Sequence, residues 1–155
     1  MAIRVQCEYF DAGAEIRAFG GNPGIGAIAS FIGLVRNEND GSAVASMTLE
    51  HYPGMTEKAL AGIVAEAGSR WEVLECTVIH RYGELKPADQ IVFVAVASGH
   101  RGDAFAACEF IMDYLKTRAP FWKKEQTPQG ARWVEAHASD NEAAGRWQRK
   151  DSGAA

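Results

Sequence analysis

Two periodicities alternate along the chain. Apolar residues at every second position, or in short continuous runs, favour strands, whereas apolar residues three and four apart favour helices. The expected strands span 3–10, 27–36, 45–52, 73–81, 91–98, 121–126 and 131–136. The expected helices span 12–19, 56–71 and 103–118. Because hairpins interrupt the alternation of strand and helix, we predict an α+β (mixed α/β) fold instead of a doubly wound sheet.

The segment 56–71 is the clearest amphipathic helix. Its apolar face follows the helical repeat through Leu60, Ile63, Val64, Ala67 and Trp71. Thr56 is the expected N-cap, because a hydroxyl can accept a hydrogen bond from a free N–H of the first turn. For the helix 103–118 we expect Asp103 as the cap and Pro120 as the stop.

The connections are marked by glycine, proline and small polar residues. We expect loops at 20–26 and 37–43 and a turn over 83–90. A type I turn is predicted at 127–130, because proline and glycine occupy favoured positions there. The polar segment 139–155 is expected to be a flexible C-terminal tail, so that residues 1–138 form a single domain.

Composition narrows the class of protein. A net charge of −4 and a pI near 5.6 argue against a nucleic-acid partner, so binding of an anion requires a local cluster of cations. Cys7, Cys76 and Cys108 lie far apart and are expected to be reduced. No apolar run reaches the roughly 20 residues that cross a membrane, and a signal peptide is not evident. We expect a cytoplasmic protein without a membrane partner.

Two familiar motifs do not fit their required context. The GxGxxA pattern at 24–29 precedes an expected strand, whereas a dinucleotide site needs a helix there. The four histidines, at 51, 80, 100 and 137, have no close metal-binding spacing, so only a cluster formed in space could hold a metal.

Lys116 has an unusual position on the helix 103–118. The apolar stripe is predicted to run through Phe105, Cys108, Met112 and Leu115, and Lys116 falls on the same side. One interpretation is a surface lysine in the last turn that favours the negative end of the helix dipole. The other is a partly desolvated amine beside a cleft, whose pKa burial or other cations would lower.

Further cations occur where elements end. Lys123 and Lys124 follow Pro120, Arg36 closes a strand, and His100 and Arg101 precede the helix. Strand ends and helix-entry loops are where α/β proteins gather ligands. On an acidic protein, such a group predicts binding of a small anion or of a partner's carboxylate tail.

Three stretches together resemble the large subunit of molybdopterin synthase. They are LEHYPGM at 49–55, VIHRYGEL at 78–85 and MDYLKTRAPFWKKE at 112–125, and the resemblance extends over about residues 27–147. It implies an α/β hammerhead fold with an additional small β subdomain. It also implies a sulfurtransferase that inserts two sulfurs into cyclic pyranopterin monophosphate, forming the dithiolene of molybdopterin.

The resemblance further implies the partners and the site. A small ubiquitin-like subunit donates sulfur from its Gly-Gly thiocarboxylate, and large subunits dimerise within a heterotetramer. Lys116 and Lys123 match the family's catalytic lysines, and no cofactor or metal is required. The positions matching substrate contacts are Leu34, Val35, Arg36, His100, Arg101, Lys124 and Glu125. Leu34 stands where at least one relative has a lysine, so only a backbone contact is implied there.

Two other functions use the same residues. A non-catalytic module could capture a partner's acidic C-terminus with these cations. A metal-dependent hydrolase could use His51, His80 and His100. Product formation separates the enzyme from the binding module, and metal analysis tests the hydrolase.

Overall fold

The main sheet forms the centre of the fold. The computed structural model describes residues 1–39, 41–134 and 138–148. The sheet has the strand order β1-β6-β8-β2, with bounds Ala2–Gln6 (β1), Glu75–Arg81 (β6), Gln90–Ser98 (β8) and Ala27–Leu34 (β2). β1 is parallel to β6, and the other two pairs are antiparallel. The central strands β6 and β8 are nearly continuous runs of buried residues, because helices cover both faces.

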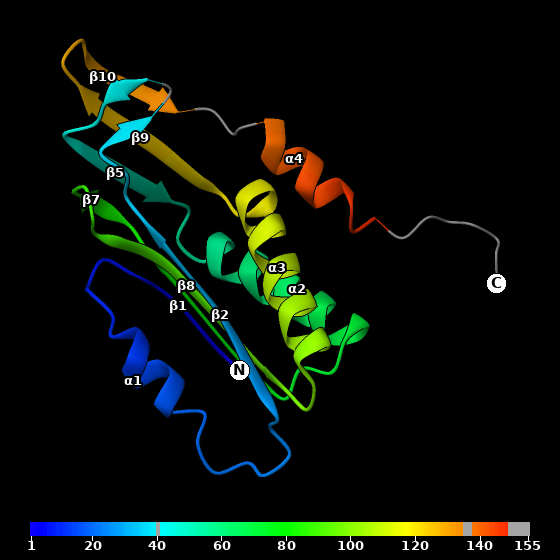
Figure 1. The fold of residues 1–155 in the computed structure, drawn as a ribbon. Helices are drawn as coiled ribbons and strands as arrows, with labels where there is room; N and C mark the ends of the chain where they lie inside the picture. The colour runs from blue at the N-terminus through cyan, green and yellow to red at the C-terminus, as the bar shows by residue number, and fades with distance from the viewer. Residues whose placement is uncertain (40, 135–137, 149–155) are drawn as a thin grey trace.

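Helices pack on opposite faces of this sheet. α2 (Met55–Arg70) and α3 (Arg101–Arg118) lie side by side on one face, and the short α1 (Ala12–Arg17) lies on the other (Figure 1). The larger core joins α2 and α3 to the sheet, with Leu60, Val94 and Phe110 fully buried in it. The smaller core places Phe10 and Phe19 against Phe93 beneath α1.

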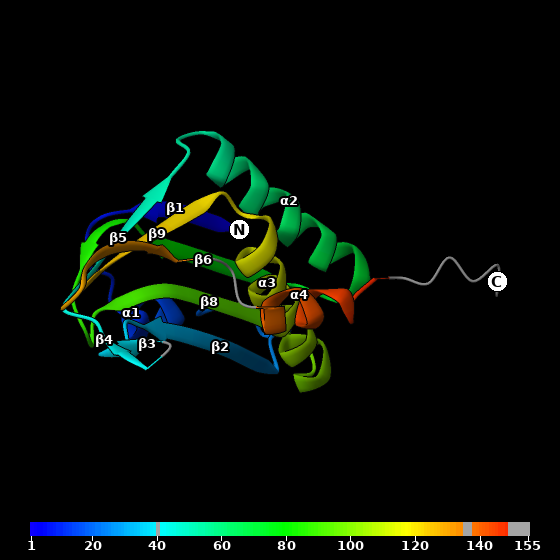
Figure 2. The same cartoon turned by 90° about the horizontal axis from the view of Figure 1, so that it is seen from above.

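A second sheet continues from the end of the first. Its order is β10-β9-β5-β7, with bounds Gly130–Val134 (β10), Phe121–Thr127 (β9), Ser46–His51 (β5) and Gly83–Leu85 (β7). A two-residue ladder, β3 (Glu38–Asn39) with β4 (Ser42–Ala43), lies beside β2 at the same end (Figure 2). The expected α+β class is confirmed, and the second sheet forms the additional β subdomain.

Several local expectations are wrong in detail. α2 begins after Gly54, and Thr56 is a buried residue whose hydroxyl donates to the carbonyl of Pro120 (3.1 Å). α3 begins after His100, and Asp103 accepts from the N–H of Glu72 (3.0 Å) instead of capping its own helix. The expected turn 83–90 contains β7, which pairs with β5.

The buried face of α3 also differs from the expected stripe. Ala104, Ile111 and Leu115 lie at its centre, whereas Phe105 is 65% exposed. At 100° per residue, Phe105 and Lys116 both fall at the edge of that face. Lys116 therefore borders the core and is itself exposed.

The expected flexible tail contains a docked helix. α4 (Ala138–Gly145) packs on α3, and the indole of Trp147 lies edge-on to Trp71 and Phe110. Trp147 Nε1 donates to Asp113 Oδ2 (2.6 Å). The rest of that tail, 149–155, lies outside the described residues, as do His137 and the last two residues of the strand expected at 131–136.

Candidate functional site

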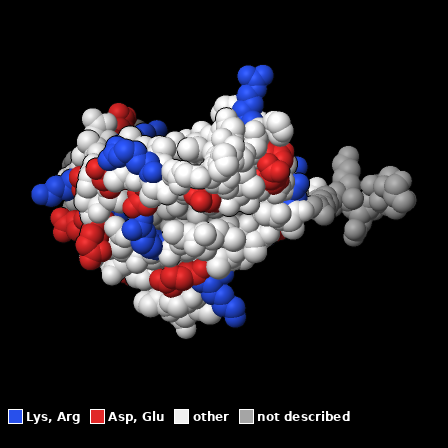
Figure 3. Space-filling model, turned by 90° about the horizontal axis from the view of Figure 1, so that it is seen from below, with Lys and Arg blue, Asp and Glu red and all other residues white. Residues whose placement is uncertain are grey.

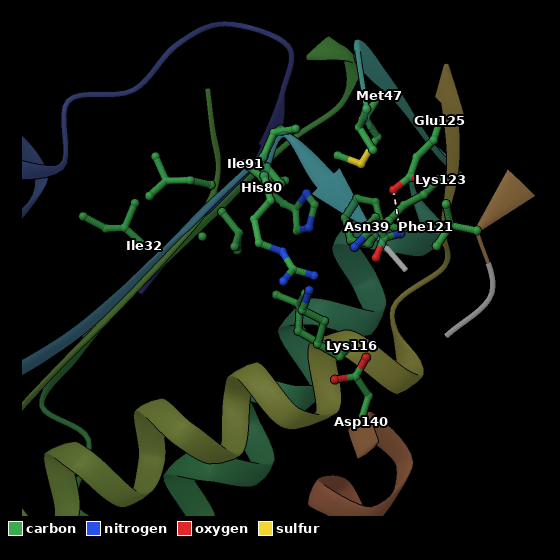
Figure 4. Close-up of a pocket in the computed structure, with 18 of the residues that line it drawn as sticks. Ile32, Asn39, Met47, His80, Ile91, Lys116, Phe121, Lys123, Glu125 and Asp140 are labelled. Carbon is green, nitrogen blue, oxygen red and sulfur yellow. Dashed lines mark hydrogen bonds between the residues drawn. The ribbon is translucent and has the colours of Figure 1, made fainter. Parts of the chain in front are cut away.

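A cavity of about 510 Å³ opens where the two sheets and the end of α3 meet (Figure 4). Its walls come from β2 and the residues after it, from β3, β5, β6, β8, β9 and β10, and from the helices α3 and α4. The residues that carry charge or a titratable ring there are Arg36, Glu38, His80, Lys116, Lys123, Glu125 and Asp140. The cavity thus gathers groups from across the sequence.

The end of α3 places two lysines in this cavity. Lys116 lies in the last turn of α3, and the chain becomes extended at Ala119 before β9 starts at Phe121. Pro120 cannot continue the helix, and its carbonyl is held by Thr56. The sharp change of direction brings Lys123 back to the same cavity as Lys116, as Figure 4 shows.

Lys123 is the more buried of the two amines. The pKa of Lys123 is lowered to about 8, first by burial and then by the charge of Lys116 and a side-chain hydrogen bond with Lys116. Asp140 and Glu125 oppose this pKa shift. From the sequence, a desolvated amine was one of two interpretations of Lys116. In the structure the more buried amine, with the lowered pKa, is Lys123, on the strand beyond the proline.

Glu125 is bound to protein groups. Its carboxylate is almost fully buried and accepts from Asn39 Nδ2 (2.7 Å) and from Arg132 Nε and Nη2 (3.3 and 3.1 Å). Arg132 also donates to the carbonyl of Asn39 (2.9 Å). Glu125 thereby ties the β3–β4 ladder to the β9–β10 hairpin at the cavity wall.

The end of β2 supplies three expected residues. A register irregularity at Gly33 and Leu34 turns the chain out of the sheet. The N–H of Val35 donates to the backbone carbonyl of Asp89 (2.9 Å), and the side chain of Val35 is buried. Arg36 is exposed and lines the cavity, as do Leu34 and Val35.

Three of the expected substrate contacts lie elsewhere in this chain. His100 and Arg101 stand at the start of α3, which puts them roughly 24 Å from Lys116 along the helix axis. Lys124 points away from the cavity and lies over the ring of Trp133 (5.6 Å to its centroid). Side chains alternate along a strand, so Lys123 and Glu125 face inward and Lys124 faces outward.

Sequence reasoning missed three residues of the cavity. His80 was weighed only as a metal ligand, although a histidine that directly follows the apolar pair Val78 and Ile79 within a strand is itself a signal of a buried polar role. Asn39 lay in an expected loop and Asp140 in an expected tail, where local pattern gives no indication of a site.

The histidines proposed for a hydrolase do not form a group of metal ligands in the described residues. His80 is in the cavity, the ring of His51 is tilted against that of Tyr82 (4.3 Å between ring centroids), and His100 is the N-cap residue of α3. Among residues 1–39, 41–134 and 138–148, no group of three or more potential ligands could hold a metal ion.

One face of the surface carries charges of both signs. On the face in Figure 3, acidic and basic side chains are interspersed around an uncharged area. The described helices include none that is long and apolar enough to span a membrane.

Comparisons with known proteins agree with this geometry. Residues 5–118 match the family model described as MoaE protein. The molybdopterin synthase catalytic subunit of Ralstonia nicotianae is 68% identical over 146 residues, which cover 94% of this chain and 83% of that protein. The subunit of the same name from Pseudomonas aeruginosa is 60% identical, covering 96% and 99%. The MoaE structure from Burkholderia ambifaria MC40-6 superposes with a TM-score of 0.79 at 58% identity, covering 95% and 98%.

Proposed function

The chain belongs to the MoaE protein family, and we infer that it is the catalytic subunit of a molybdopterin synthase. In this function it transfers sulfur from the C-terminal thiocarboxylate of a small ubiquitin-like subunit to cyclic pyranopterin monophosphate, forming the dithiolene of molybdopterin. The observation that carries the proposal is the convergence of Lys116, Lys123 and Arg36 on one cavity.

The cavity suits a reaction between two anions. A thiocarboxylate and a phosphate repel one another, and fixed cations offset that repulsion while they position both groups. The thiocarboxylate is itself a sulfur nucleophile, so the chain needs no thiol of its own. This agrees with Cys76 and Cys108, which lie in the core and whose pKa values burial raises to about 12 and about 11.

We propose distinct roles for the two lysines. Lys116 is exposed at the cavity wall, where it can reach the carbonyl of the partner's inserted C-terminus. Lys123 has a pKa of about 8, so near neutral pH it exchanges between ammonium and amine and can move a proton. Arg36, with Leu34 and Val35 beside it, would hold the phosphate of the substrate.

The side chains of Glu125 and Lys124 both contact other protein groups, so we propose that neither binds the substrate directly. Glu125 is occupied by Asn39 and Arg132, so we propose that it fixes the cavity wall. The Lys124 side chain lies over Trp133, so its proposed contact with substrate falls to its backbone.

The reconstituted reaction tests the proposal. The purified chain is mixed with a thiocarboxylated Gly-Gly-ended protein and cyclic pyranopterin monophosphate, and product is detected by fluorescence after oxidation. Lys116→Ala should abolish product formation and Arg36→Ala should raise KM, whereas Lys58→Ala, an exposed change on α2, should do neither. Binding of the carrier protein without product from the unaltered chain would favour the non-catalytic binding module.

His100 and Arg101 complete the site if it is shared between two copies. We propose a homodimer in which these residues of one copy face the cavity of the other, within a heterotetramer with two small subunits. Mixing Lys116→Ala with Arg101→Ala chains should then restore activity, because one site of each mixed dimer carries no lesion. Mixing Lys116→Ala with Arg36→Ala should not, since both residues line the same cavity. Failure of the first mixture would overturn the shared site.

We also propose a cytoplasmic location. The three cysteines, two of them buried, are free thiols, which suits a reducing compartment.

A further inference from the structure

His80 is a buried ring in the cavity wall to which the mechanism above gives no role. It lies on the central strand β6, is 5% exposed, and stacks on Phe121 with 3.8 Å between ring centroids. Figure 4 shows the imidazole facing the cavity, near Lys116 and near Phe121 at the start of β9. A stacked ring in a packed strand cannot turn away, so its edge keeps one direction.

A backbone hydrogen bond fixes the tautomer of this ring. Nδ1 lies 2.9 Å from the carbonyl of Arg81, and because a carbonyl only accepts, Nδ1 carries the proton. The side chain of Arg81 is itself anchored, with hydrogen bonds to the carbonyls of Cys7 and Gln90. In the neutral ring Nε2 is therefore a fixed acceptor.

The surroundings keep the ring neutral. The pKa of His80 is lowered to about 3, mainly by burial, with smaller contributions from Lys116 on α3, Lys123 on β9 and His51 on β5. The hydrogen bond to Arg81 opposes this shift of the pKa. Within the described part of the chain, no protein group forms a hydrogen bond with Nε2. Nε2 is also absent from the fully buried polar atoms without a partner, which are Arg70 Nε and Gln90 Oε1. An acceptor on a nearly buried ring thus opens into the cavity.

The chemistry of the cavity explains why such an acceptor is useful. Arg36, Lys116 and Lys123 as ammonium only donate, and Glu125 is already occupied. The other acidic side chains of the cavity, Glu38 and Asp140, are carboxylates that would repel a phosphate. The pterin part of cyclic pyranopterin monophosphate carries N–H groups, and these need acceptors when water is removed. A neutral imidazole supplies one without repelling the phosphate, as a further carboxylate would.

We propose that Nε2 of His80 is a substrate-binding acceptor that takes a hydrogen bond from an N–H or O–H group of the pterin substrate. The inference rests on the proposed function and assigns the recognition of a donor group to a residue outside the cationic set. It differs from a general-base role, because the ring accepts a hydrogen bond and does not take the proton.

Binding of cyclic pyranopterin monophosphate, without the sulfur donor, tests this directly. His80→Phe keeps a flat ring against Phe121 and removes the acceptor, and His80→Gln places an amide oxygen near the position of Nε2. Calorimetry should show affinity about tenfold weaker for His80→Phe. His80→Gln should recover part of this loss, and thermal melting checks that both variants are folded. The ratio of wild-type to variant affinity should stay constant from about pH 6 to about pH 9, because the ring stays neutral.

A second measurement keeps the test independent of folding changes. In the unaltered chain, the nitrogen NMR resonance of His80 Nε2 should move when substrate is added, while that of Nδ1 stays nearly unchanged. Equal affinities for wild type and His80→Phe, or an unmoved Nε2 resonance with substrate bound, would overturn the inference. A changed Lys123 pKa in His80→Phe, together with an unchanged affinity for the substrate, would also overturn the inference. Nε2 would then accept its hydrogen bond from a lysine and not from the substrate. If the unaltered chain forms no product with the thiocarboxylated protein and cyclic pyranopterin monophosphate, the proposed function fails instead.

Discussion

At the scale of single residues, the two lysines of the cavity differ in their position and in their burial. Lys116 stands at the rim of a helix face, and Lys123 stands on an inward position of a strand. An ammonium on an inward strand position loses water and meets the charge of its neighbour. Its protonation therefore couples to folding as well as to chemistry.

The lowered pKa of Lys123 predicts a pH-dependent cost to stability. Below pH 8 folded and unfolded chains both hold this proton, and the folded state bears the full cost of the buried charge. Between pH 8 and the ordinary value of 10.5 only the unfolded chain holds it, so stability rises with pH. Lys123→Met should then stabilise the chain at pH 7 by on the order of 1–2 kcal/mol, after discounting the full shift for residual solvent contact.

Urea unfolding at pH 7 and pH 10 measures this difference. The gain from Lys123→Met should shrink at pH 10, where the folded wild type has already released the proton. Lys58→Met, an exposed change on α2, should stay within about 0.5 kcal/mol of wild type at both values. A gain of equal size at both pH values would show that the methionine stabilises by apolar contact alone.

At the scale of elements, Glu125 links two parts of the β subdomain. The contacts with Asn39 and Arg132 join the β3–β4 ladder to the hairpin, and the Glu125 carboxylate is only 6% exposed. Removing one partner of a nearly buried charged group leaves the other group partly unsatisfied. We expect Arg132→Met to cost about 1–3 kcal/mol, since Arg132 itself is partly exposed.

A double-mutant cycle isolates that link. Glu125→Gln, Arg132→Met and the double variant should show a coupling of at least about 0.5 kcal/mol in unfolding free energy. Additive losses would mean that the two side chains act independently of one another.

Gly26 shows how one element is fixed against another. A Cβ at Gly26 would lie 2.2 Å from the carbonyl oxygen of Gly99, so the start of β2 needs glycine for this close approach to the end of β8. The GxGxxA pattern thus reflects contact between two backbones, with a strand following it. Gly26→Ala should destabilise the chain by about 2 kcal/mol or more through overpacking. Gly62→Ala, in open space on α2, should stabilise it slightly, and thermal melting of the two variants compares them.

The periodicity of the sequence predicted most elements because each signal is local. The buried strands β6 and β8 and the helix α2 carry their patterns within a few residues. The errors arise where a distant partner decides the structure. The hydroxyl of Thr56 donates to the carbonyl of Pro120 and does not cap α2. The three residues of β7 form a strand only because they pair with β5.

At the scale of the whole molecule, the site depends on contacts that no local pattern reports. The motif at 112–125 predicted that Lys116 and Lys123 meet, and the proline between them gave the reason. It did not predict that His80 and Asp140 join them, since one lies on the central strand and the other on a helix in an expected flexible segment. His100 and Lys116 were expected in one site although the expected helix 103–118 already lay between them, and α3 does separate them by its full length.

The docking of α4 connects overall stability with the protonation of Lys123. Trp147 fixes the end of this segment against Trp71, Phe110 and Asp113, and α4 carries Asp140 into the cavity. Trp147→Ala should lower the unfolding free energy by about 3 kcal/mol. If α4 then leaves α3, Asp140 no longer raises the pKa of Lys123, which should fall further below about 8.

An NMR pH titration of the Lys123 side chain measures that coupling. Asp140→Asn should lower the pKa in the same direction without the loss of stability, because it removes the charge and leaves Trp147 in place. Trp133→Ala, an exposed tryptophan on the hairpin, should change neither quantity appreciably. Trp147→Ala could instead destabilise the chain and leave the Lys123 pKa unchanged, while Asp140→Asn lowers that pKa. This result would show that α4 stays at the cavity without Trp147. The C-terminal helix would then be held by the ion pairs of Arg146 with Glu109 and Asp113.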